Sequence, residues 1–157
     1  MTDTAGSGPV PGFGEEALAR AEAALAAMAG HFEAWMAEEL ARLEAAQDAF
    51  AREPGPASAA GLHTCAHDLK GLAATYGHPL AGRAAASLCR LLEGARGGED
   101  APARLAADHV AAARTLADLR TDDEDHPVGA PLCASLERRV DDHLARAPVA
   151  AVEGLGR

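Results

Sequence analysis

The chain has 157 residues and a formal net charge of −10 at pH 7, and only 3% of its residues are aromatic. A chain of this length normally forms one domain with its own core, which Leu and Ala must fill here because aromatic residues are scarce. The negative charge argues against a nucleic-acid partner and against an anionic membrane surface.

The N-terminal part is predicted to be a disordered tail over 1–14 followed by helix over 15–52. The tail holds mostly Gly, Ser, Pro and Thr, which bury little apolar surface. Gly30 is the expected place for a break, giving a short lead helix and a longer one. The helix is predicted because apolar residues recur at steps near three and four, namely Leu18, Leu25, Met28, Phe32, Met36, Leu40, Leu43 and Phe50.

The second helix follows the Pro54-Gly55-Pro56 stretch, which ends the first one. Ser58 is the expected cap, and the helical pattern continues to Tyr76. Gly77 is then the expected left-handed residue that terminates the helix. A third helix is predicted over 80–94, with Leu80, Ala84, Leu88, Leu91 and Leu92 facing inward.

Two further helices complete the pattern. Asp100 is the expected cap of the fourth, which ends near Arg120 and carries His109 on its core stripe. An acidic turn over 121–127 leads to a last helix over 132–147, and residues 148–157 should fray. The segments are helical and their connections are short, which favours antiparallel neighbours. We therefore expect an all-α domain over 15–147, an antiparallel up-and-down four-helix bundle with an additional N-terminal helix.

The sequence also bears on where the protein resides. No apolar run approaches the length of a membrane span, and the N-terminus lacks the basic and apolar regions of a signal peptide. The three cysteines, Cys65, Cys89 and Cys133, lack tight spacing, which is typical of a reducing compartment. We expect a cytoplasmic protein with no membrane partner.

The second helix carries the most distinctive group of residues. Its buried seam is predicted to hold Leu62, Ala66, Leu69, Ala73 and Tyr76. A second stripe, one residue further round the helix, holds His63, His67, Lys70 and Ala74, with Gly71 at its edge.

Lys70 is the only lysine in a chain that otherwise uses arginine. An ammonium is a compact, movable point charge, whereas a guanidinium is a wide planar fork. A neutral imidazole can act as a nucleophile and form a covalent phosphoryl intermediate. His67 is therefore the candidate phosphoacceptor, Lys70 the cation that stabilises the phosphoryl group, and Gly71 the position that lets another protein approach. The chain has no glycine loop typical of ATP binding.

These residues resemble the histidine-containing phosphotransfer (HPt) domain. Such domains read H-x-x-K-G, then small residues, then a glycine ten positions after the histidine; here these are His67, Lys70, Gly71, Ala74 and Gly77. The resemblance is specific over residues 62–93. It places Cys89 on the neighbouring helix facing His67, where family members often have a polar residue. His63 lies four residues before His67 and is expected to be a partly buried helper that shapes the surface around it.

The resemblance implies a phosphorelay intermediate of two-component systems. His67 would accept a phosphoryl group from an aspartate of one receiver domain and pass it to another. The partners would be response regulators or a hybrid histidine kinase, and the receiver would bring Mg²⁺, so this chain would need no cofactor or metal of its own. It would act stoichiometrically, as a monomer, without kinase activity.

Two alternatives remain open. Asp68 replaces the Thr or Ser usual after the family's histidine, and His67-Asp68-Leu69-Lys70 also resembles the phosphoacceptor box of histidine-kinase dimerisation helices. That box continues to a proline, where this chain has Leu72, and no kinase ATP domain follows. The other alternative is a non-catalytic helical adaptor in which the motif has decayed.

Overall fold

The computed structural model describes residues 13–94, 96–98 and 100–146. This part of the chain is helical and contains no strand, so the predicted all-α class is confirmed. The N-terminal tail is predicted over 1–14, but α1 already begins at Phe13. Residues 1–12 of that tail and the predicted tail over 148–157 lie outside the described residues. Within the described ranges, no helix is both long and apolar enough to cross a membrane. The elements are α1 (Phe13–Arg52), α2 (Pro56–Leu72), α3 (Pro79–Gly94), a short 3-10 helix η1 (Arg96–Gly98), α4 (Ala103–Asp118) and α5 (Gly129–Arg146).

The predicted caps of two helices are wrong. Helix α2 begins at Pro56 rather than after Ser58, and the Ser58 hydroxyl donates a hydrogen bond to the Glu53 carbonyl at 2.7 Å. Helix α4 follows Pro102, while Asp100 lies in the preceding turn. Proline has a fixed φ suited to helix entry and no N–H to satisfy, so it can start a helix without a side-chain cap.

The end of α2 is partly as predicted. The helix ends at Leu72, so Tyr76 lies in the following turn and not in the helix. Gly77 has φ +83°, which confirms its predicted left-handed conformation. The turn is closed by the His78 N–H, which donates to the Ala73 carbonyl at 2.8 Å. This αL glycine therefore ends the turn that follows α2, ten residues after His67.

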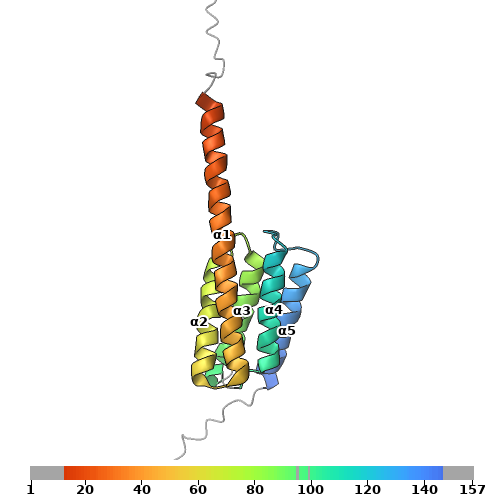
Figure 1. The fold of residues 1–157 in the computed structure, drawn as a ribbon. Coiled ribbons are helices and arrows are strands. Elements are labelled where there is room, and N and C mark those ends of the chain that lie inside the picture. Colours follow the sequence, from red (N-terminus) through yellow and green to blue (C-terminus); the bar gives the residue numbers. More distant parts are fainter. Residues whose placement is uncertain (1–12, 95, 99, 147–157) are drawn as a thin grey trace, which may run out of the picture.

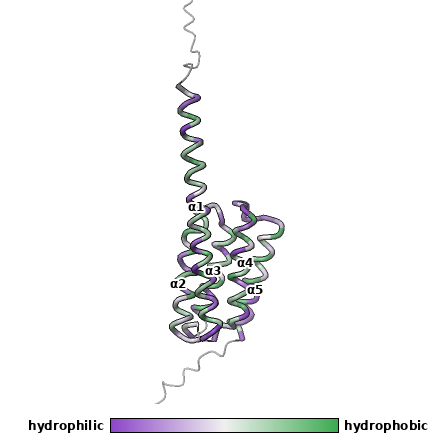
Figure 2. The backbone as a smooth tube through the Cα atoms, viewed as in Figure 1, coloured by the Kyte–Doolittle hydropathy of each residue, from purple (hydrophilic) through white to green (hydrophobic). Residues whose placement is uncertain are grey.

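Helix α1 runs without interruption through Gly30, so the predicted break is wrong. One mid-helix glycine costs only about 1 kcal/mol relative to alanine, and the neighbouring residues are mostly strong helix formers. Residues 14–31 are all exposed, and we call this segment the free half of α1. It extends beyond the other helices (Figure 1), and no other element of the described part of the chain covers its apolar residues (Figure 2). Leu18, Leu25 and Met28 are therefore exposed, whereas the core begins at Met36.

The remaining part of α1 packs with the other helices, which lie side by side (Figure 1). Contacts join α1 to α2, α2 to α3, α3 to α4, and α4 back to α1. Among the described helices, α5 contacts only α3 and α4, so the element outside this ring is C-terminal rather than the expected N-terminal one. Small residues allow close approach: a Cβ at Gly82 of α3 would lie 3.3 Å from the Ala73 Cβ. The largest fully buried side chains include Phe50, Leu43, Leu62, Leu69 and Leu88.

His109 is a core histidine, as predicted, and its position has a consequence for stability. Its Nδ1–H donates to the Leu105 carbonyl at 2.7 Å, and its Nε2 lies 2.9 Å from the Ser87 hydroxyl. Burial lowers the pKa of His109, and it also lowers the pKa of half-buried His78. Both side chains therefore take up protons more readily in the unfolded chain than in the folded one.

We expect the free energy of unfolding to decrease as the pH falls from about 7 through the ordinary histidine pKa of about 6.5. The limiting slope is about 1.4 kcal/mol per pH unit for each histidine that stays neutral in the folded state. Denaturant unfolding at several pH values measures this slope. A His109→Gln variant should have a smaller slope whatever its absolute stability, and an unchanged slope would contradict the expectation.

Candidate functional site

The structure places His67 on the solvent-exposed side of α2, next to the core. Leu62, Ala66 and Leu69 are fully buried, whereas His67 and Lys70 are exposed. The helix packs against α1 and α3 through its apolar seam, so the backbone beneath His67 is held by the core. The result is an imidazole on a rigid support with its ring open to solvent.

A second histidine and a carboxylate lie beside His67. The rings of His63 and His67 are stacked, with centroids 6.2 Å apart and an interplanar angle of 29°. The His63 Nε2 is 2.9 Å from the Glu93 Oε1 on α3. Because a carboxylate only accepts hydrogen bonds, this nitrogen carries the proton and donates it. His63 is half-buried, as expected, and this bond fixes its ring relative to α3.

Sequence reasoning missed Glu93. It lies four residues after Cys89, which was already expected to face His67, so helical spacing could have identified it. The hydrogen bond from His63 lowers the pKa of the Glu93 carboxyl, and electrostatic interaction with the nearby His63, Lys70 and His67 side chains lowers it further. The carboxylate is therefore ionised at neutral pH and adds a negative charge beside the two histidines.

Lys70 offers an uncommitted positive charge one turn beyond His67. Its ammonium forms no ion pair within the described part of the chain. It lies in the last turn of α2, where a cation interacts favourably with the helix dipole. A flexible ammonium in this position can reach a group attached to the His67 ring.

The surface next to His67 and Lys70 is open at Gly71. A Cβ added to this residue would meet nothing within 4 Å, so the packing of the chain itself does not require glycine here. Ala74 is exposed in the turn after α2, and not on the helical stripe where we expected it. The open surface therefore consists of the last turn of α2 and the turn that leads to Gly77.

Cys89 lies on α3 and is buried. Burial raises the pKa of its thiol to about 11, although the nearby charge of Lys70 acts in the opposite direction. The thiol therefore stays protonated at neutral pH and is not a nucleophile. Cys89 contributes to the site only by its packing in the core, where α3 meets the neighbouring helices.

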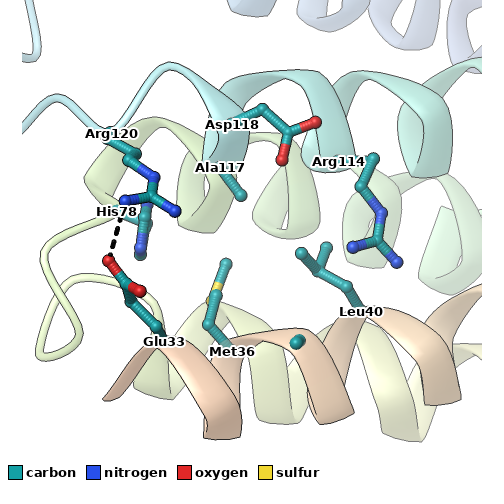
Figure 3. Close-up of a pocket in the computed structure, with 9 residues that line it drawn as sticks. Glu33, Met36, Leu40, His78, Arg114, Ala117, Asp118 and Arg120 are labelled. Carbon is teal, nitrogen blue, oxygen red and sulfur yellow. Dashed lines mark ion pairs between the residues drawn. The ribbon is translucent and has the colours of Figure 1, made fainter. Parts of the chain in front are cut away.

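A separate cavity of about 150 Å³ lies between α1, α4 and the turn before α3 (Figure 3). Its charged groups are largely paired: Arg120 lies 3.0 Å from Glu33, and Arg114 donates to both carboxylate oxygens of Glu44 through its Nε and one Nη nitrogen. The His78 Nδ1 is buried there, and no hydrogen-bond partner for it exists among the described residues. None of the residues expected to carry phosphoryl chemistry lines this cavity.

Comparison of the chain with protein-family models, with curated proteins and with solved structures found no match. The chemistry of the site is therefore the basis for a functional proposal. The site consists of an exposed imidazole, an ammonium one turn away that forms no ion pair with the described residues, and an open surface at Gly71.

Proposed function

We propose that this chain is a histidine-containing phosphotransfer protein, in which His67 carries a phosphoryl group between receiver domains. The observation that carries the proposal is the exposure of His67 and Lys70 on one face of α2, next to the open surface at Gly71. In this proposal the helices form an antiparallel up-and-down four-helix bundle. The short connections at 53–55 and 73–78 favour that arrangement, since each helix must return beside its predecessor.

The reaction is the transfer of one phosphoryl group. A lone pair on the neutral His67 imidazole attacks phosphorus, and a nitrogen–phosphorus bond forms. The bond from phosphorus to the receiver's aspartyl oxygen breaks, and the aspartate leaves as a carboxylate with the bonding electron pair. The other ring nitrogen keeps its proton. The reverse step, with a second receiver's aspartate as nucleophile, passes the group on.

The site residues would support this transfer by position and charge. Lys70 would stabilise the negative charge on the phosphoryl oxygens, and Gly71 would allow the receiver to approach α2 closely. The receiver, belonging to a response regulator or a hybrid histidine kinase, would supply Mg²⁺. The chain would be a stoichiometric carrier rather than an ATP-dependent kinase.

The proposal is tested by incubating the full chain with a receiver domain phosphorylated on its aspartate. Phosphohistidine is labile in acid and stable in alkali, whereas aspartyl phosphate is hydrolysed by alkali. We expect alkali-stable label on this chain, together with loss of label from the receiver. Absence of label with several phosphorylated receivers would contradict the proposal and favour a helical adaptor.

Replacement of Lys70 by alanine should slow phosphoryl transfer without unfolding the protein. We expect the transfer rate to decrease about ten- to a hundredfold. Removing a buried hydrogen-bond donor to a developing anion slows a reaction by more than this, but water weakens the effect of a charge at this exposed site. Rapid-quench measurement of transfer from a phosphorylated receiver gives the rate, and circular dichroism gives the helix content.

Lys70→Arg is the matched control for the charge. It keeps the positive charge but replaces the compact ammonium with a planar guanidinium, so an intermediate rate is expected. A Lys70→Ala variant that transfers at the wild-type rate would remove Lys70 from the proposed site. Loss of helix content in that variant would indicate a structural lysine instead.

A further inference from the structure

The exposed apolar surface of this protein is concentrated at one end. The free half of α1 extends from the end of the molecule where α2 finishes and α5 begins (Figure 1). Every large hydrophobic side chain that is exposed in the described residues lies on α1 up to residue 35 or at that end. These are Leu18 (59% exposed), Leu25 (65%), Met28 (50%), Trp35 (44%), Leu72 (36%) and Val128 (63%).

The apolar residues of the free half form a stripe typical of a coiled coil. The stripe consists of Leu18, Ala21, Leu25 and Met28, whose spacing alternates between three and four residues. The same spacing leads on to Phe32 and Trp35, which pack against Tyr76 of the same chain at ring-centroid distances of 5.4 Å and 5.8 Å. Such spacing makes a seam that fits a second helix with the same repeat. Residues 23–30 contain no charged side chain on any face, which is unusual for a helix surrounded by water.

We infer that the free half of α1 pairs with the free half of α1 in a second copy of this chain. The second copy supplies a helix of equal length and equal repeat, and a two-fold arrangement satisfies both stripes at once. The flanking positions at Ala17, Ala24 and Ala29 are small, so two such helices can approach closely. This inference is independent of the phosphotransfer proposal.

The fold selects an antiparallel orientation for the pair. The stripe continues along the same helix into Met36, Leu40 and Leu43, which are buried against the rest of the molecule. A parallel partner would follow the seam into that covered region and collide with it. An antiparallel partner instead ends there, and pairs Leu18 of one copy with the other copy's Met28, and Ala21 with Leu25.

The antiparallel arrangement also covers the remaining exposed residues. The N-terminal end of the free half in each copy would lie against the other copy, at the end of its helices that carries Leu72, Trp35 and Val128. A stable interface usually engages about 20–30 residues on each side, and one face of the free half plus this end provides fewer. The dimer should therefore form reversibly, with a dissociation constant on the order of micromolar or weaker. It departs from the monomer that the family resemblance implies.

The test is sedimentation equilibrium of the full chain over a range of concentrations from about 1 µM to 1 mM. We expect the mass to rise from that of the 16.0 kDa monomer toward twice that value. Leu25→Glu should weaken association at least tenfold, because it places a carboxylate in the seam. Ala23→Glu adds the same charge to the opposite face of the same helix and should leave association unchanged. A chain that stays monomeric throughout, or equal behaviour of the two variants, would overturn the inference.

The orientation has its own readout. In the antiparallel pair, residue 18 of one copy lies level with residue 28 of the other. The two copies of residue 18 are therefore about 15 Å apart along the helix axis, at about 1.5 Å of rise per residue. A disulfide needs Cα atoms within about 7 Å. Leu18→Cys should therefore form no more covalent dimer under oxidation than the wild type, which carries Cys65, Cys89 and Cys133 as the background. Efficient cross-linking through Cys at this position would show a parallel pair and overturn the arrangement.

Discussion

Replacement of His67 by glutamine should abolish alkali-stable labelling of this chain by a phosphorylated receiver. Glutamine has a similar length and remains polar, but its amide nitrogen is not a nucleophile. His67 is exposed and is not one of the core residues, so the variant should fold normally. The expected result is complete loss of label, measured by autoradiography after alkaline treatment, with helix content unchanged.

His63→Gln is the matched control for this experiment. His63 lies one turn earlier on the same stripe, and its ring is 6.2 Å from that of His67. Its Nε2 is occupied by the hydrogen bond to Glu93, so it should not accept the phosphoryl group itself. We expect His63→Gln to take up label. If His67→Gln were labelled as strongly as the wild type, or if the label moved to His63, the assignment of the acceptor would be wrong.

Truncation of Leu43 to alanine should destabilise the protein by about 3–5 kcal/mol, whereas the same truncation of Leu25 should change stability by less than about 0.5 kcal/mol. The two leucines lie on the same apolar pattern of the same helix. Leu43 is fully buried in the core, however, and Leu25 is 65% exposed. Only the first substitution removes buried methyl groups and leaves a cavity.

Urea denaturation at protein concentrations low enough to keep the chain monomeric measures both effects. The low concentration matters because Leu25 lies in the inferred dimer seam. Equal destabilisation by the two substitutions would mean that the free half of α1 is covered within a single chain. That result would also remove the surface on which the inferred dimer depends.

Most of the local structure could be predicted from the sequence because short-range physics determines it. Apolar spacing identified each helix, and Gly77 was identified as left-handed because a helix ending there needs φ above zero. The inward residues of α3 and the core position of His109 also followed from spacing. The predicted caps failed at Ser58 and Asp100 because Pro56 already begins α2 with its fixed φ, and Pro102 occupies the cap position directly before α4.

The candidate site divides in the same way. The stripe that holds His67 and Lys70 follows from the geometry of one helix, so the sequence indicated it correctly. Glu93 is thirty residues from His63, and its carboxylate reaches that ring only because α2 and α3 pack together. A pairing between helices depends on which faces meet, and no pattern within one helix contains that information.

By itself, the sequence determined that the chain is helical, where most helices lie, and which residues share the face of His67. The tertiary structure decided which of those faces are covered. Periodicity shows that a face of α1 is apolar along its whole length. A residue on that face is buried, however, only where another helix packs beside it. The buried residues of α1 begin at Met36, where α1 packs with α2 and α4, so Leu43 became core and Leu25 remained at the surface.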